Sequence, residues 1–165
     1  MVAELKLENL LDFGKKAVKS ALKKGADEAE AYLSVGTGIS IDIERGQIVR
    51  SMKSMDQGLG VRAICNKAVG FSYTNTLTDK KVNENSERAY RAAKASRPDK
   101  NWVKFPSPKK YTEVKGTYDK RITELSSDAL VDIAAEMLAG ACDFDKRVLA
   151  VAGGASCSVF GTAVV

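Results

Sequence analysis

Apolar residues recur every three or four positions over the first 25 residues, with lysines on the opposite side. This pattern predicts an amphipathic helix that ends near Gly25. The apolar positions are Leu7, Leu10, Leu11, Gly14, Ala17, Val18, Ala21 and Leu22. Gly14 weakens the helix, but its missing side chain lets a neighbouring backbone or sheet approach closely. We therefore expect a packing contact at Gly14.

From Ala29 the apolar period changes from 3.6 to 2, which is typical of β-strands. The predicted strands span residues 29–35, 39–43, 48–55, 59–65 and 69–73. The turns between them are predicted at Gly36-Thr37-Gly38, Arg45-Gly46-Gln47, Asp56-Gln57-Gly58-Leu59-Gly60 and Asn66-Lys67. Because every connection is short, the strands must be antiparallel neighbours in one five-stranded meander.

Two more helices are predicted further along the chain. One runs from Thr78 to about Ser96 and has a shallow apolar face of small residues. The other begins where Ser126 can act as the N-cap, with Leu125 and Leu130 in the positions of a hydrophobic staple. Its apolar stripe is predicted to be core and consists of Leu130, Ile133, Ala134, Met137, Leu138 and Ala141.

The remaining segments complete the predicted fold. Residues 97–123 carry Pro98, Pro106 and Pro108 among many lysines, including Lys109 and Lys110, which predicts an extended surface loop. Residues 147–165 return to strand-like composition, and the final apolar run predicts a last strand that continues in a longer parent protein. The sum is a single α+β domain over residues 1–165, an antiparallel meander of about five or more strands covered by three amphipathic helices.

The sequence of 165 residues contains no histidine, which excludes Ser-His and Cys-His nucleophile pairs and the usual His-containing zinc sites. Cys65, Cys142 and Cys157 are widely spaced and are predicted to be buried, reduced thiols. The sequence has no signal segment and no apolar run long enough to cross a bilayer, so a soluble, cytoplasmic protein is expected.

The formal net charge of +5 is spread over the first helix, the start of the second, and the loop at 97–123. Such a distribution favours a solvated surface over a binding groove. A nucleic-acid-binding protein would interleave its basic residues with stacking aromatic residues or present an arginine-rich recognition helix. Here the basic residues are mostly lysines, so nucleic-acid binding is not expected.

Three stretches together resemble the TldD/PmbA family, namely residues 25–31 after the basic helix, the strand 38–45, and residues 56–62. The resemblance continues through residues 69–75, 93–96 and 145–148, so it covers nearly the whole chain. It implies the N-terminal domain of a longer protein, in which helices cover a curved antiparallel sheet. The motif residues Asp56, Gly58, Gly60 and Arg62 receive no assigned role from it.

Members of this family include metal-dependent peptidases, and the family name also carries a link to modulation of DNA gyrase. In the peptidase branch, a His-Glu-x-x-x-His helix supplies metal ligands and a glutamate that activates water. This chain has no such segment, so the resemblance implies no cofactor here and a divalent metal, zinc, only in a catalytic full-length member. Either the motif lies beyond Val165, or the parent is the non-catalytic subunit that associates with a catalytic one.

Other candidate sites have simpler interpretations. The stretch from Asp56 to Gly60 lacks both phosphate-loop patterns and is predicted to be a turn. Asp143 and Asp145 are interpreted as solvated acids, since no calcium-loop pattern surrounds them. Asp42 and Glu44 share one side of a strand, which we interpret as its solvent side. No catalytic or metal-binding residue is predicted.

Two functions remain open at this point. The first is a substrate-cleft and subunit-contact domain of a TldD/PmbA-type peptidase system, which binds an extended peptide through a sheet edge and is not catalytic in isolation. Its partners would be the rest of its parent, a second family subunit in a homo- or heterodimer, and the peptide. The second is a non-enzymatic interaction module or non-catalytic partner subunit that regulates DNA gyrase or another DNA-associated partner.

Overall fold

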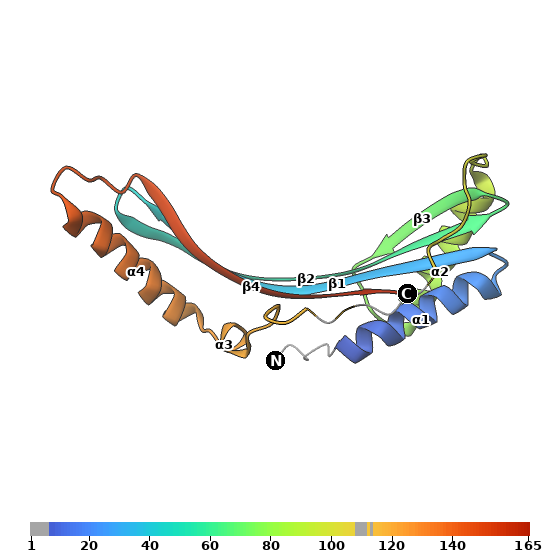
Figure 1. Cartoon of the computed structure of the whole chain (residues 1–165), viewed down its shortest axis with the longest axis horizontal. Coiled ribbons are helices and arrows are strands. Elements are labelled where there is room, and N and C mark those ends of the chain that lie inside the picture. Colours follow the sequence, from blue (N-terminus) through green and yellow to red (C-terminus); the bar gives the residue numbers. More distant parts are fainter. Residues whose placement is uncertain (1–6, 108–111, 113) are drawn as a thin grey trace. The chain divides into compact units, whose positions relative to one another are not determined.

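The computed structural model describes residues 7–107, 112 and 114–165. Its helices and strands follow in the order α1 (Leu7–Lys23), β1 (Glu28–Glu44), β2 (Gln47–Cys65), β3 (Ala68–Thr74), α2 (Asp79–Ala95), α3 (Lys120–Thr123), α4 (Ser127–Phe144) and β4 (Ala152–Val164) (Figure 1). The four strands form one sheet in the order β3-β2-β1-β4. The predicted α+β class with an antiparallel sheet is confirmed.

The predicted number of strands is wrong, because two predicted pairs are single long strands. β1 continues through the segment from Gly36 to Gly38, and β2 continues through the segment from Asp56 to Gly60. The true turns lie at Arg45-Gly46 and Asn66-Lys67, where the backbone φ angles are 50°, 76°, 49° and 66°. Such paired positive angles are those of a tight two-residue hairpin turn.

Gly36 of β1 lies at a close contact between two strands instead of in a turn. A Cβ atom on Gly36 would lie 3.3 Å from the Cβ atom of Phe160 on β4, which is tighter than ordinary contact. Gly36 therefore leaves room for the close approach of β4 at Val159 and Phe160, and the chain does not reverse direction there.

The chain forms two compact units. Unit 1 comprises residues 1–35, 56–111 and 161–165, and unit 2 comprises residues 36–55 and 112–160. The strands β1, β2 and β4 each contribute residues to both units.

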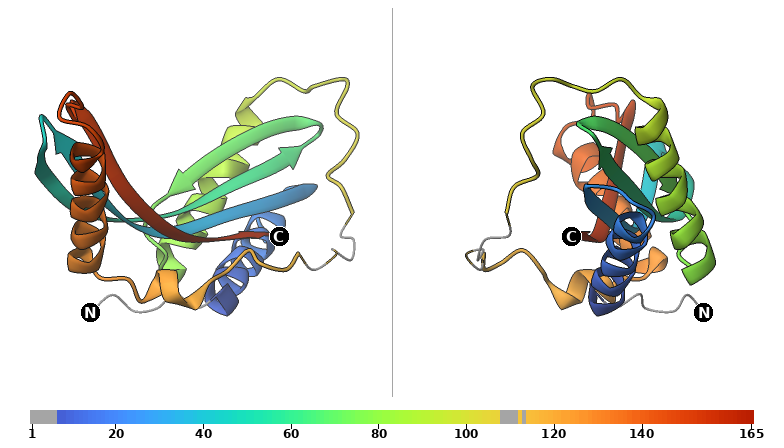
Figure 2. Two further views of the ribbon diagram at one scale, coloured as in Figure 1. Left: turned by 60° about the vertical axis from the view of Figure 1, so that its left-hand side comes forward. Right: turned by 90° about the vertical axis from the view of Figure 1, so that its right-hand side faces the viewer.

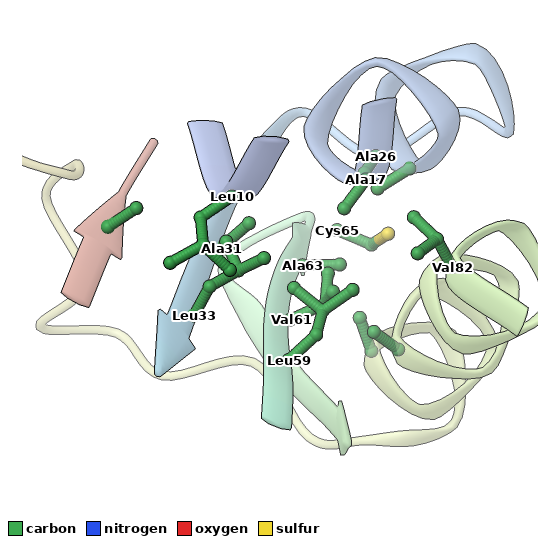
Figure 3. Close-up of a cluster of buried hydrophobic side chains, with 14 residues drawn as sticks. Leu10, Ala17, Ala26, Ala31, Leu33, Leu59, Val61, Ala63, Cys65 and Val82 are labelled. Carbon is green, nitrogen blue, oxygen red and sulfur yellow. The ribbon is translucent and has the colours of Figure 1, made fainter. Parts of the chain in front are cut away.

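In unit 1, α1 and α2 bury the same face of the sheet. Leu10 and Ala17 of α1, Leu33 of β1, Val61 of β2 and Val82 of α2 belong to one cluster and converge in Figure 3. The expectation at Gly14 is confirmed, because a Cβ atom there would lie 2.6 Å from Cγ2 of Val165.

The second predicted helix is confirmed as α2, which lies beside β3 in both views of Figure 2. Thr78 is its N-cap, and the side-chain oxygen accepts a hydrogen bond from the backbone of Lys81 at 3.4 Å. A Cβ atom on Gly70 of β3 would lie 2.1 Å from the backbone nitrogen of Ala93 and 2.2 Å from the carbonyl oxygen of Ala89. Only glycine permits so close an approach of helix and strand.

In unit 2, α4 packs on the isoleucines of β1. Ser126 caps the helix as predicted, accepting a hydrogen bond from the backbone of Ala129 at 3.1 Å. The core contains Leu130 and Ala134 of α4 together with Ile39, Ile41 and Ile43. The predicted stripe is wrong in part, because Ile133, Met137 and Ala141 are exposed and only Leu138 is half-buried against this core.

The predicted loop at 97–123 contains the short helix α3, and Pro108, Lys109 and Lys110 lie outside the described residues. The cysteines are free, as expected, but their predicted burial is wrong for Cys142, which is exposed. Cys65 is buried and Cys157 is half-buried. None of the described helices is both long and apolar enough to cross a membrane.

Candidate functional site

The four motif residues of β2 share one face of the sheet in unit 1. Asp56, Gly58, Gly60 and Arg62 occupy alternate positions, and side chains of a strand point alternately to opposite faces. The positions between them, from 59 onward, are buried in the core beneath the helices. The motif therefore faces away from the core, although the sequence had placed its first residues in a turn.

Three exposed aromatic residues lie on this same face. Gly60 pairs with Tyr73 and Arg62 pairs with Phe71 across β2 and β3, and paired residues point to the same side. Tyr32 alternates with buried residues of β1 and so faces this side too. Tyr32 is 51% exposed, Phe71 is 59% exposed and Tyr73 is 74% exposed. We call these three residues with Gly58 and Gly60 the aromatic face.

The two glycines shape the aromatic face. A Cβ atom on Gly60 would lie 3.1 Å from Cε2 of Phe71, so the phenyl ring covers this position. At Gly58 the nearest atom to such a Cβ is the carbonyl oxygen of Thr74 at 3.9 Å, which leaves the backbone uncovered. The result is a low strip of backbone bordered by rings, where another backbone could approach closely.

Arg62 is held in place at one end of the aromatic face. Its Nε and Nη2 atoms donate to Oε1 of Glu30 at 3.0 and 2.7 Å. The guanidinium group also lies 5.1 Å from the ring centroid of Phe105, which is a cation–π contact. Because the Arg62 side chain is 46% exposed, the ion pair contributes at most about 1 kcal/mol. The Arg62 side chain is therefore fixed in position, although its ion pair adds little to stability.

The segment that follows α2 is anchored beside Arg62. The carboxylate of Glu28 accepts hydrogen bonds from Nε1 of Trp102 at 3.1 Å and from the backbone of Phe105 at 2.8 Å. The two rings pack edge to face with centroids 5.0 Å apart. Residues 102 and 105 of the predicted loop are thus bound to the sheet, while Tyr73 and Gly58 stay open.

Sequence reasoning missed the aromatic face as a site. Its signal was present, because Phe71 and Tyr73 alternate with Gly70 and Ser72. Alternation alone does not say which side of a strand is buried. The answer came from α2, whose backbone leaves room only for Gly70 on the covered side.

The prediction of solvated acids is confirmed for Glu44 and Asp143, which are exposed, whereas Asp42 and Asp145 are half-buried and paired with arginines. Asp42 lies opposite the buried side of β1 and pairs with Arg50, whose Nε donates at 2.7 Å. Asp145 accepts two hydrogen bonds at 2.9 Å from the guanidinium group of Arg147, and these hold the pKa of Asp145 below its ordinary value. Glu44 is exposed at the end of β1.

No metal centre can be built from the part of the chain that the structure describes. Within it, no three His, Cys, Asp or Glu side chains come close enough together to hold an ion. The residues present therefore do not fit the divalent metal that the family resemblance implies for a catalytic member.

Comparison with known proteins gives consistent matches. Residues 29–97 match the family model described as "PmbA/TldA metallopeptidase domain 1". An uncharacterised protein of Methanocaldococcus jannaschii is 30% identical over 141 residues, which cover 86% of this chain and 31% of that protein.

Solved structures share the fold over almost the whole chain. TldE from Thermococcus kodakarensis superimposes with a TM-score of 0.80 and 28% identity, covering 96% of this chain and 34% of that one. A Bacteroides thetaiotaomicron protein named "putative modulator of DNA gyrase" gives a TM-score of 0.75 at 20% identity, covering 99% of this chain and 36% of that one. The second likeness shows the fold alone. The chain spans about a third of the length of these relatives.

Proposed function

The chain belongs to the TldD/PmbA family, and from this membership we propose that it is the substrate-cleft and subunit-contact domain of a metal-dependent peptidase system acting on peptides. The observation that supports this role is the aromatic face. The side chains of Asp56 and Arg62 lie on the side of β2 that the helices leave uncovered, and Gly58 and Gly60 lie between them on that side. Residues needed only for core packing would point the other way.

The aromatic face suits an extended peptide. Gly58 leaves the backbone uncovered, and Phe71 and Tyr73 beside it offer rings on which side chains can pack. The sheet also ends in two edge strands, β3 and β4, to which a peptide could add through main-chain hydrogen bonds. Such pairing tolerates many sequences, which suits a peptidase substrate.

Hydrolysis is assigned to another part of the system. The 165 residues contain no histidine and so cannot supply the His-Glu-x-x-x-His helix of the catalytic branch. In this proposal the metal belongs either to the remainder of a longer parent or to a second family subunit. The domain described here contributes binding and orientation, which raise the effective concentration of the peptide bond at the metal.

Peptide binding is tested by amide hydrogen exchange on this chain, with and without a panel of unstructured peptides about ten residues long, enough to span a typical strand. We expect slower exchange along one edge strand when peptide is added. Substitution Tyr73→Ser should raise the dissociation constant about fivefold to tenfold, because exposed aromatic anchors often contribute more than about 1 kcal/mol to binding.

The matched control is Tyr118→Ser, which removes a tyrosine that is also largely exposed, at 66%, but lies in unit 2. It should leave peptide binding unchanged. Unchanged exchange at every edge strand, together with equal affinities for the two tyrosine variants, would contradict the proposal.

A second candidate is a non-enzymatic module that regulates a DNA-associated partner. DNA binding of this kind would weaken steeply with salt, since each phosphate contact releases a counterion. A titration with duplex DNA at two salt concentrations separates the candidates. Tight, salt-sensitive binding without any peptide effect would favour the regulatory module.

A further inference from the structure

The side of the sheet that carries the aromatic face has a charge opposite to that of the whole chain. The formal net charge of the chain is +5. The lysines of α1 and α2 lie on helices that cover the other side of the sheet in unit 1. On the uncovered side, the strands of unit 1 present three acidic residues and one arginine, namely Glu28, Glu30, Asp56 and Arg62. This side is therefore locally acidic in a basic protein.

Two of the three carboxylates already have partners within the domain. Glu28 accepts hydrogen bonds from the segment that follows α2, and Glu30 accepts two from Arg62. Asp56 is exposed and forms no ion pair with any side chain that the structure describes. The carboxylate of Asp56 is therefore available to a ligand.

The positive charge near this side is concentrated at the end away from Asp56. Arg62 and Asp56 are six residues apart on β2, which corresponds to about 20 Å along a strand. Lys100 and Lys104 belong to the segment that binds at the Arg62 end, so their charge adds to that of Arg62. Exposed charges more than about 10 Å apart are largely screened at ordinary salt concentrations. The surroundings of Asp56 are therefore acidic.

Gly58 leaves an open position between Asp56 and an exposed aromatic ring. Asp56 is two residues away on the same strand and the same side, a spacing of about 7 Å. Tyr73 pairs with Gly60 and is thus the diagonal neighbour of Gly58 on β3. Diagonal neighbours on a sheet are within reach of an aromatic side chain. A ligand group above Gly58 would have a carboxylate on one side and a tyrosine ring on the other.

A lysine or arginine side chain suits this position. Its cation would pair with the carboxylate of Asp56, and the face of the Tyr73 ring attracts cations. Its apolar stem would lie along the exposed ring, as the stems of long basic side chains do on apolar surfaces. The domain already contains a contact of this kind, since the guanidinium group of Arg62 lies 5.1 Å from the ring centroid of Phe105.

We propose that the aromatic face selects extended peptides that carry a lysine or arginine side chain, with the cation above Gly58 between Tyr73 and Asp56. The inference rests on the proposed peptide-binding function and adds a preference for basic peptides to it. Main-chain pairing admits many sequences, and the cation then fixes the position of the peptide along the face.

The test is fluorescence polarisation with three labelled peptides of about ten residues, built from Val, Thr and Ser and blocked at both ends. They differ in one central residue, which is lysine, norleucine or glutamate. Norleucine keeps the four-carbon chain of lysine and lacks the ammonium group. The lysine peptide should bind about threefold to tenfold more tightly than the norleucine peptide, and the glutamate peptide should bind most weakly. The preference for lysine should shrink as salt is raised, because exposed charges are screened.

Substitution Asp56→Asn should reduce the preference for lysine over norleucine at least threefold. The matched control is Asp12→Asn, which removes the same charge from an exposed position of α1, on the other side of the sheet, and should leave the preference intact. At position 73, Tyr73→Phe should retain the preference and Tyr73→Leu should reduce it, because only an aromatic ring attracts the cation. Circular dichroism checks that each variant is folded.

The outcomes separate this inference from the proposed function. Equal affinities for the lysine and norleucine peptides would overturn the inference alone, and peptide binding would stand. A preference that Asp56→Asn leaves intact, or that Asp12→Asn reduces equally, would also overturn it, because the selective charge would then lie elsewhere. Failure of all three peptides to bind would overturn both the inference and the proposed function.

Discussion

Unit 1 and unit 2 differ in how many helices and strands contribute buried residues to their hydrophobic clusters. In unit 1, α2 touches β3 through backbone atoms at Gly70, and the buried cluster draws on two helices and three strands. In unit 2, the core beneath α4 consists of five residues, and α4 keeps Ile133 and Met137 exposed. Each fully buried aliphatic side chain contributes about 1.5–3 kcal/mol, so unit 1 carries the larger share of stability.

The largest expected effect is that of Gly70→Ala. The added methyl group would meet backbone atoms of Ala89 and Ala93, which cannot move unless the whole of α2 shifts. We expect a loss of about 3 kcal/mol in the free energy of unfolding, at the upper end of the range for overpacking. Urea denaturation followed by the fluorescence of Trp102 measures it, because this single tryptophan lies in unit 1.

The same substitution in unit 2 should have the opposite sign. A Cβ atom on Gly140 of α4 would meet nothing within 4 Å, and alanine is favoured over glycine in a helix by about 1 kcal/mol. Gly140→Ala should therefore stabilise unit 2, as followed by the circular dichroism of thermal unfolding. Equal effects of the two substitutions on stability would contradict the conclusion that the backbone is closely packed at Gly70 and open at Gly140.

The helices and the glycines show how much of the fold the sequence alone could predict. The helices were predictable because their caps and periods are local signals, as at Thr78 and Ser126. Gly36 and Gly60 were placed in predicted turns because glycine permits both a bend and a close contact. Only the neighbouring strand or helix determines which of these occurs, and the sequence does not specify that neighbour.

The strand lengths were underestimated for a related reason. β1 and β2 contain 17 and 19 residues, whereas most strands are about five or six residues long. Expected lengths therefore favoured dividing them at any glycine. The motif residue Asp56 was placed in a turn on that basis, so its shared face with Gly58, Gly60 and Arg62 could not be recognised.

A buried hydrogen-bond network in unit 1 predicts an effect of intermediate size on the free energy of unfolding. The side chain of Asn85 accepts a hydrogen bond from Ser72 at 2.7 Å and donates to the carbonyl oxygens of Leu59 and Ser72 at 3.3 Å. Asn85→Ala would leave these groups buried without a partner, at a cost of about 2 kcal/mol. Urea denaturation by tryptophan fluorescence again measures it, since the network lies in unit 1.

The control for that network is Asn83→Ala on the exposed side of the same helix. It should change the free energy of unfolding by less than about 0.5 kcal/mol, as surface substitutions usually do. An equally large loss at both positions would show that helix propensity, and not the buried hydrogen bonds, accounts for the effect.

The smallest expected effect concerns thiol reactivity. Burial, followed by the nearby charge of Asp27, raises the pKa of the Cys65 thiol above its ordinary value of 9.0. Because only the thiolate reacts, iodoacetamide at pH 8 should label exposed Cys142 of unit 2 first and Cys65 of unit 1 last. The raised pKa also means that the stabilising contribution of neutral Cys65 is fully present below pH 9 and is lost as the pH rises through its folded-state pKa. Mass spectrometry of timed samples assigns each label, and Cys65→Ala should remove the slow phase. Labelling of Cys65 as fast as Cys142 would show that unit 1 opens as readily as unit 2, contrary to the packing difference between them.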